Sequence, residues 1–175
     1  MVMIDLITGF LGSGKTTFLK KYAEYLMDQG LHIGILENDF GAINVDMLML
    51  HELRGDQCEL EMIAGGCDAE SHRRRFRTKL ISMRMCGYDR VLVEPSGIYD
   101  VDEFFDVLRE EPLDQWYEIG NVIAILDARL ENNLSQQADY LLASEAANAG
   151  KVILSHADAA TREQCEDTVA HLNRA

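Results

Sequence analysis

Short apolar, β-branched runs alternate along the chain with longer stretches in which apolar residues recur every three or four positions. The first pattern is typical of buried strands and the second of amphipathic helices. Strands are predicted over residues 2–8, 31–36, 59–64, 90–93, 121–126 and 151–154. Helices are predicted over residues 15–29 and 71–85 and from residue 160, and the other intervals are long enough for crossover helices. This alternation predicts an α/β domain with helices on both faces of a mostly parallel sheet.

The residues after the first predicted strand match the phosphate-binding pattern GxxxxGK[ST] at every fixed position. Small residues let backbone N–H groups turn towards phosphate oxygens, and the helix that follows adds partial positive charge. Lys15 is predicted to reach the β- and γ-phosphates, and the Thr16 hydroxyl to bind Mg²⁺. The candidate nucleotide-binding residues of this loop are Gly9, Gly12, Ser13, Gly14, Lys15, Thr16 and Thr17. The alternative is a glycine-rich turn without function, which the strand–loop–helix context disfavours.

A carboxylate suited to the same Mg²⁺ ion follows the buried run at residues 91–93. Glu94 stands at the carboxyl end of that predicted strand, and ligands of parallel α/β sheets bind at this edge. Gly97, three residues later, is suited to donate a backbone N–H to a γ-phosphate. Lys15, Thr16 and Glu94 are therefore the candidate catalytic residues, although Glu94 could instead cap a strand at the surface.

Composition limits the classes of binding partner and the cellular compartment that we expect for this protein. Sixteen Lys and Arg residues against thirty Asp and Glu residues give a formal net charge of −14. So acidic a chain repels phosphate backbones and anionic lipid, so neither nucleic acid nor a membrane is expected as a partner. The first residues lack the basic segment and cleavage site of a signal peptide, and the four cysteines are widely spaced. We therefore expect a cytoplasmic protein with reduced thiols.

Four motifs occur here in the order found in the CobW-type GTPases, which are related to the UreG and HypB metal-insertion GTPases. They are Gly9 to Thr17, Glu37-Asn38-Asp39-Phe40-Gly41 with Val45-Asp46, Gly66-Cys67, and Glu94-Pro95-Ser96-Gly97. The chain resembles that family over essentially its whole length. The resemblance implies one P-loop GTPase domain at residues 1–175, without the C-terminal domain that relatives usually carry.

The resemblance also implies a function and further site residues. Residues 37–46 resemble a nucleotide-sensing switch, with Glu37 and Asp39 near Mg²⁺ or a second metal. Carboxylates that face a polyphosphate need a cation between them, whereas an ordinary acidic loop does not. The implied role is a Mg²⁺-dependent protein that binds GTP or GDP, hydrolyses GTP slowly and assists delivery of a metal or a cobalamin-type cofactor. A client metalloprotein or corrinoid protein, and a second copy of the chain, are the partners that this role allows.

The sequence departs from the family pattern at two sites. The usual Cys-x-Cys-Cys metal motif is replaced by Cys67-Asp68-Ala69-Glu70. One thiolate predicts a weak Zn²⁺ or Co²⁺ site that needs Glu37, Glu70 or His72 as further ligands. Cys67 as a packing residue is the open alternative.

The guanine-reading Asn-Lys-x-Asp is replaced by Ser155-His156-Ala157-Asp158. Asp158 keeps the carboxylate that pairs with guanine, Ser155 keeps a hydrogen-bond donor, and His156 could stack on the base. The alternative places Asp158 as the cap of the helix predicted from Ala160. GTP is therefore the expected nucleotide, and ATP is its competitor.

Two other function classes stay open. One is a nucleotide-binding module without hydrolysis, and the other is a small-molecule kinase, which shares the P-loop. A kinase usually carries a mobile basic lid over the phosphates, and only the basic run at residues 73–77 could supply one. A solvated helix with acidic neighbours is the simpler interpretation of that run.

Overall fold

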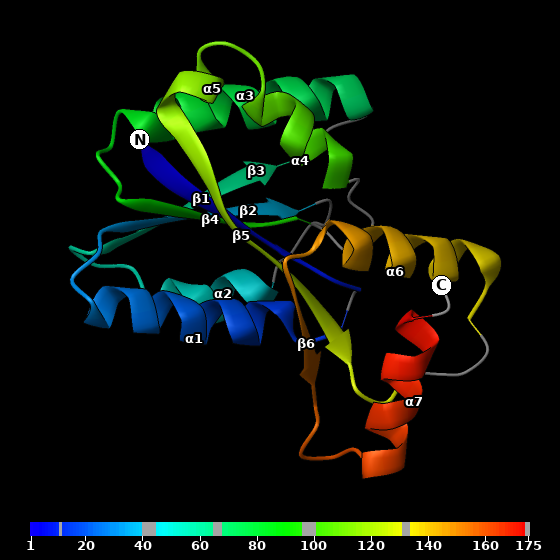
Figure 1. Ribbon diagram of the computed structural model, residues 1–175. Coiled ribbons are helices and arrows are strands. Elements are labelled where there is room, and N and C mark those ends of the chain that lie inside the picture. The colour runs from blue at the N-terminus through cyan, green and yellow to red at the C-terminus, as the bar shows by residue number, and fades with distance from the viewer. Residues whose placement is uncertain (11, 40–44, 65–67, 96–100, 131–133, 174–175) are drawn as a thin grey trace.

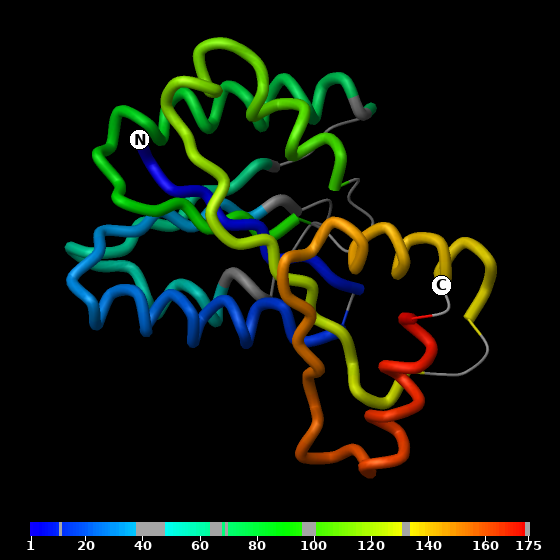
Figure 2. The backbone as a smooth tube through the Cα atoms, viewed as in Figure 1, coloured from blue at the N-terminus to red at the C-terminus, as the bar shows by residue number. Residues whose placement is uncertain are grey.

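A computed structural model of the chain describes all residues except 11, 40–44, 65–67, 96–100, 131–133 and 174–175, and it leaves the side chains of residues 38, 39, 45–47, 64 and 69 undescribed. One sheet has the strand order β3-β2-β4-β1-β5-β6, and every neighbouring pair is parallel. Its strands are β1 (Val2–Thr8), β2 (Ile33–Asp39), β3 (Cys58–Ala64), β4 (Arg90–Glu94), β5 (Tyr117–Asp127) and β6 (Lys151–Ser155). Figure 2 shows the blue first strand passing through the middle of the molecule. The parallel α/β class predicted from the alternating pattern is confirmed.

Helices cover both faces of this sheet (Figure 1). They are α1 (Lys15–Asp28), α2 (Val45–His51), α3 (Ala69–Arg84), α4 (Val101–Leu108), α5 (Leu113–Trp116), α6 (Gln136–Asn148) and α7 (Arg162–Leu172). Helices α1 and α2 lie on one face, and α3, α4 and α5 lie on the other. Each face has its own apolar core, one including Leu19 and Ile35 and the other including Phe76 and Phe104. Burial of these side chains supplies the main driving force for the fold.

The predicted elements all exist, and their ends shift by a few residues. Strand β2 runs on to Asp39, and β5 begins at Tyr117 because its first residues pair with the start of β1. Helix α1 ends at Asp28, and Gly30 has φ of +80°, the left-handed conformation that glycine tolerates after a helix.

The last helix corrects one alternative for Asp158. Helix α7 begins at Arg162, and its cap is Thr161, whose hydroxyl accepts a hydrogen bond from the Gln164 backbone N–H at 3.1 Å. The Gln164 side chain accepts from the Thr161 N–H in return, which completes a capping box. A Thr with Gln three residues later is the stronger start signal, so Asp158 is not the helix cap.

A buried carboxylate of the central strand β1 connects β1 to α1, β4 and β5, towards the end of the sheet away from the P-loop. Asp5 is fully buried, and its Oδ2 accepts hydrogen bonds from Tyr22 Oη and Arg90 Nη1, each at 2.8 Å. Its Oδ1 accepts from the Asn121 backbone N–H at 2.7 Å, where the register between β1 and β5 shifts. The charge is both paired and hydrogen-bonded, as a buried carboxylate requires.

Within the described part of the chain, no helix is long and apolar enough to cross a membrane. Three of the four cysteines, Cys58, Cys86 and Cys165, are described and are free thiols. That agrees with the prediction of reduced cysteines at these three positions.

Candidate functional site

The loop between β1 and α1 has the backbone that its glycines predict. Gly9, Gly12 and Gly14 have φ of 140°, 78° and 88°, which L side chains rarely adopt. A Cβ on Gly9 would also lie 2.2 Å from the Ile125 carbonyl oxygen of β5. The sharp turn and its close approach to β5 therefore both require glycine at this position.

The side chains of this loop are buried and turned inward. Lys15 is buried, and its Nζ donates hydrogen bonds to the carbonyl oxygens of Gly9 at 2.9 Å and Phe10 at 3.1 Å. Ser13 Oγ is buried and has no hydrogen-bond partner among the described residues. A buried hydroxyl without a partner costs free energy unless a ligand satisfies it. An ammonium and an unsatisfied donor at a helix N-terminus form a cradle suited to an anion.

Three residues with oxygen-bearing side chains lie at the carboxyl edge of the sheet beside this loop. Thr16 Oγ1 donates a hydrogen bond to Glu94 Oε1 at 2.9 Å, across 78 residues of sequence. Glu37 of β2 is the direct register partner of Glu94 on β4. Glu37 is only 3% exposed and Glu94 7%. Two buried carboxylates on adjacent strands repel each other unless a cation or a proton lies between them, and a hydroxyl with carboxylates is the donor set that Mg²⁺ prefers. The residues present therefore fit a Mg²⁺ ion.

The end of β6 lies against the P-loop. An ideal Cβ on Gly14 would lie 3.6 Å from Ser155 Cβ and 3.9 Å from His156 Cε1. Ser155 Oγ donates to the Leu126 carbonyl oxygen at 3.1 Å, so this hydroxyl is engaged by β5. His156 has φ of 52°, and its Nδ1 lies 3.1 Å from Asp127 Oδ2. Tertiary structure thus brings the two sequence-predicted segments, residues 9–17 and 155–158, side by side.

A cavity of about 240 Å³ opens between the P-loop and the end of β5. Its lining residues are Phe10, Gly12, Ser13, Leu126, Asp127, Arg129, Leu130 and Leu134. Arg129 Nε and Nη2 donate to the two carboxylate oxygens of Asp127 at 3.0 and 2.9 Å, and this pairing holds the pKa of Asp127 down at about 2. The hydrogen bonds to Asp127 raise the pKa of Arg129 most, and the charge of the exposed Asp158 adds to that rise. Apolar walls with one fixed charge pair suit the flat part of a nucleotide.

Sequence reasoning missed a buried carboxyl beside the P-loop lysine. Glu145 of α6 is 3% exposed, and its Oε2 has no hydrogen-bond partner among the described residues. Burial raises the pKa of Glu145 to about 7, although the Lys15 ammonium and a hydrogen bond from the Thr8 hydroxyl oppose that rise. The sequence gives little indication of this burial. Glu145 follows the apolar Leu142 by about one turn of α6, but its partners Thr8 and Lys15 lie more than 120 residues earlier.

Three predicted site residues lie outside the described part of the chain. They are Cys67 and the side chain of Asp39, both predicted for a metal, and Gly97, predicted to donate an N–H to the γ-phosphate. Glu70 is exposed in the first turn of α3. His72 is buried, with its Nδ1 2.9 Å from Glu103 Oε1 of α4, so this ring nitrogen is engaged away from Glu70. Among the described residues no group of three or more His, Cys, Asp or Glu side chains could hold a metal ion. The mixed site around Cys67 therefore stays a prediction.

Comparison with known proteins agrees with this geometry. The profile of the CobW/HypB/UreG nucleotide-binding domain matches residues 3–175. The zinc chaperone YjiA of Escherichia coli is 29% identical over 186 residues, which cover 98% of this chain and 55% of YjiA. The zinc chaperone YeiR of the same organism is 28% identical over 164 residues, covering 93% of this chain and 49% of YeiR. The chain thus spans about half the length of these relatives.

Solved structures show the same fold at lower identity. The crystal structure of Zn(II)-bound YjiA GTPase has a TM-score of 0.59 and 21% identity, and the match covers 98% of this chain and 54% of that one. FlhF complexed with GTP/Mg²⁺ has a TM-score of 0.58 and 19% identity over 98% of this chain and 62% of that one. Since the profile covers nearly every residue, this chain belongs to the CobW/HypB/UreG nucleotide-binding domain family.

Proposed function

We propose that this domain is a Mg²⁺-dependent GTP-binding switch with slow hydrolysis, and that its nucleotide state controls delivery of a metal ion to a client protein. The observation that carries the nucleotide part is the meeting of Thr16, Glu94 and Glu37 beside the Lys15 cradle. Lys15 and Thr16 lie on α1, Glu37 lies on β2, and Glu94 lies on β4. Residues from three separate elements thus lie together with the chemistry that a cation and a phosphate need, which supports this proposal over a fortuitous glycine-rich turn.

The chain's own residues perform four tasks in this proposal. The backbone of the P-loop holds the phosphates, and Lys15 exchanges its two carbonyl partners for the outer phosphate oxygens, where it neutralises developing charge. Thr16, Glu94 and Glu37 would hold Mg²⁺, which shields phosphate charge when bound. Asp158 and the cavity beside Asp127 would hold the base. Slow turnover is part of the proposal because no glutamine or arginine stands out in the sequence as the residue that would orient the attacking water.

Nucleotide binding and hydrolysis are tested with purified protein. Fluorescent GDP is displaced by GTP, GDP, ATP and ADP with and without Mg²⁺, and phosphate release is followed at high protein concentration. GTP and GDP should compete best, and Glu94→Gln should lower Mg²⁺-dependent turnover while Tm stays within a few degrees. Glu118→Gln, which neutralises an exposed carboxylate of β5, is the matched control.

Each outcome decides between function classes. Binding without phosphate release above background would favour the module without hydrolysis. Phosphate transfer to an added small molecule would favour a kinase. Full turnover of Glu94→Gln at limiting Mg²⁺ would remove Glu94 from the site.

The metal-delivery part rests on the names of the two relatives reported above, both zinc chaperones, and on Cys67, which stands at the position of the family's metal motif. The metal is the cargo here, and a single thiolate with oxygen or imidazole ligands gives weak binding, on the order of 10⁻⁶ M. A cobalamin-type client, a homodimer and a cytoplasmic location belong to the same proposal. Binding should weaken as pH falls, because protons compete for the thiolate and imidazole.

Titration of Zn²⁺ and Co²⁺ into wild type and Cys67→Ala, with GDP and with a GTP analogue, tests this part. Cys86→Ala is the matched control, since Cys86 is an exposed free thiol at the other end of α3. We expect weaker binding in Cys67→Ala alone and a dependence on the nucleotide. Identical isotherms for wild type and Cys67→Ala would make Cys67 a packing residue.

A further inference from the structure

The basic run at residues 73–77 has no role in the site described above, and the fold divides it between two sides of α3. Arg73 Nη2 lies 2.6 Å from Glu110 Oε1, and Arg77 Nε lies 3.0 Å from Glu110 Oε2. These two arginines therefore fasten α3 to the segment that follows α4. Arg74 and Arg75 are exposed on another side, where they line a groove.

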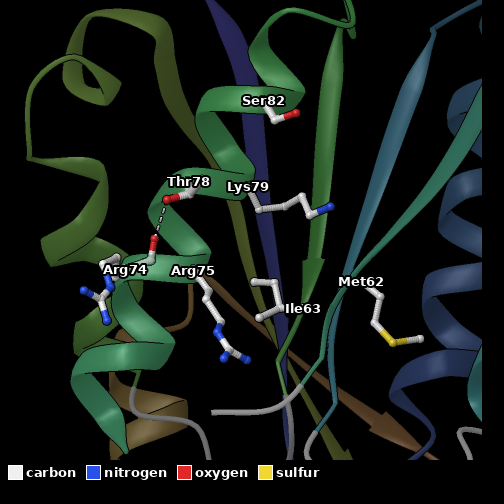
Figure 3. Close-up of a pocket in the computed structure, with 7 residues that line it drawn as sticks. All are labelled: Met62, Ile63, Arg74, Arg75, Thr78, Lys79 and Ser82. Atoms are coloured by element: carbon white, nitrogen blue, oxygen red, sulfur yellow. Dashed lines mark hydrogen bonds between the residues drawn. The ribbon is translucent and has the colours of Figure 1, made fainter.

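This groove, with a volume of about 630 Å³, runs between α3 and the outer strand β3 (Figure 3). Helix α3 contributes Arg74, Arg75, Thr78, Lys79 and Ser82, and β3 contributes Met62 and Ile63. Figure 3 shows Arg75 and Lys79 extending from the helix towards the strand side. The groove is apolar along the strand and cationic along the helix.

The groove wraps around the edge of the sheet. Successive strand residues point to opposite faces, so a groove that touches both Met62 and Ile63 must pass the backbone between them. Within the described residues β3 is the last strand on its side, with β2 as its sheet neighbour. Half of the backbone groups of an outer strand lack a sheet partner and can pair with an added strand.

Charge and length select the occupant. We propose that this groove binds an extended acidic segment of a partner protein, which lies along β3 and directs its carboxylates to Arg74 and Arg75. From residue 74 to residue 82 the helix rises about 12 Å, the length of roughly four residues of extended chain. The groove is cationic although the chain carries a net charge of −14, so an acidic segment is attracted here and repelled elsewhere on the surface.

Other occupants fit less well. The cations spread along one side of the helix instead of converging on a point, which does not suit a small anion. Nucleic acid and anionic lipid need a broad basic surface, which a net charge of −14 opposes. Of the acids beside α3, Glu61 Oε2 pairs with Lys79 Nζ at 2.8 Å, and Asp68 caps the helix.

The groove also adjoins the nucleotide site through the sheet. Met62 on β3, Glu37 on β2 and Glu94 on β4 form one row of register partners. Adjacent strands lie about 4.8 Å apart, so Met62 lies about one strand spacing from Glu37 and about two, roughly 10 Å, from Glu94. A partner segment in the groove would thus lie next to the strand that carries Glu37, while its binding chemistry does not depend on the proposed nucleotide hydrolysis.

The test uses a fluorescein-labelled peptide of ten residues that alternates Glu and Val, with a Lys–Val peptide of the same length as control. Anisotropy at low salt should show binding of the Glu–Val peptide alone. Arg74→Glu with Arg75→Glu should weaken it by about tenfold. The matched control is Arg109→Glu with Arg162→Glu, which changes the net charge equally at exposed positions outside the groove. A Glu–Val peptide with proline at its centre should bind more weakly, because proline removes a backbone donor.

Four results would overturn the proposal. The first is no binding of the Glu–Val peptide by wild type at about 1 mM, the range of a weak specific site. The second and third are equal losses of affinity in the two double variants and unchanged affinity in Arg74→Glu with Arg75→Glu. The fourth is displacement of the peptide by inorganic phosphate at constant ionic strength. Arg74→Gln with Arg75→Gln replaces the reversed pair if Tm shows unfolding. GDP affinity is measured in parallel and should not change, so a failure of this proposal is distinguishable from a failure of the nucleotide assignment.

Discussion

Glu145 gives a stability prediction whose size follows from its burial. Burial raises the pKa of this carboxyl from 4.5 to about 7 in the folded protein. The folded state therefore keeps a proton that the unfolded state has lost between pH 4.5 and pH 7. Because the folded state binds more protons there, stability falls as pH rises through this range and is level above it.

Glu145→Gln keeps the shape and the acceptor for the Thr8 hydroxyl but removes the titration. Each pKa unit corresponds to about 1.4 kcal/mol, so the raised pKa of Glu145 lowers the free energy of unfolding by about 3 kcal/mol at pH 8 and by about 1.4 kcal/mol at pH 5.5. The variant should thus gain about 2 kcal/mol more at pH 8 than at pH 5.5. For a domain of this size that corresponds to a Tm difference of roughly 4–8 °C.

The assay is thermal unfolding of nucleotide-free protein at pH 5.5, 7 and 8, followed by circular dichroism. Wild type, Glu145→Gln and the exposed control Glu118→Gln are compared at each pH. The effect of an unsatisfied amide is the same at every pH, so only the change with pH tests the reasoning. A Tm difference between Glu145→Gln and wild type that stays constant from pH 5.5 to pH 8 would refute it.

Three further substitutions test other parts of the structure. Lys15→Ala should weaken triphosphate binding more than diphosphate binding in the displacement assay, because its ammonium serves the outer phosphates; an equal loss for both would limit it to the inner ones. Asp158→Asn should reduce the preference for GTP over ATP by roughly tenfold or more, since a hydrogen bond to a charged group contributes about 1.5–3 kcal/mol; an unchanged ratio would remove it from base recognition. Gly120→Ala should lower the free energy of unfolding by about 1–3 kcal/mol, because its Cβ would lie 2.2 Å from buried Asp5 Oδ1, whereas Gly55→Ala, with open space around it, should have little effect in urea unfolding.

The sequence alone determined the fold class, the order of the strands along the chain and the phosphate-binding loop. These features depend on short-range signals, namely side-chain periodicity and the glycines of residues 9–14. The parallel class also implied that Glu94 ends its strand at the ligand edge, and the Thr16–Glu94 hydrogen bond agrees with that placement. The cap at Thr161 was equally local, and the Thr–x–x–Gln pattern could have found it.

Only the tertiary structure decided which distant residues meet. The register that sets Glu37 beside Glu94 depends on the spatial strand order, which adjacent sequence does not encode. The burial of Glu145 follows from the packing of α6 over the end of β1, and the division of the arginine run follows from Glu110 lying on one side of α3. Periodicity determines which face of its own helix or strand a side chain occupies. The partners of that side chain, its solvent exposure and therefore its charge state depend on elements from elsewhere in the chain that pack against it.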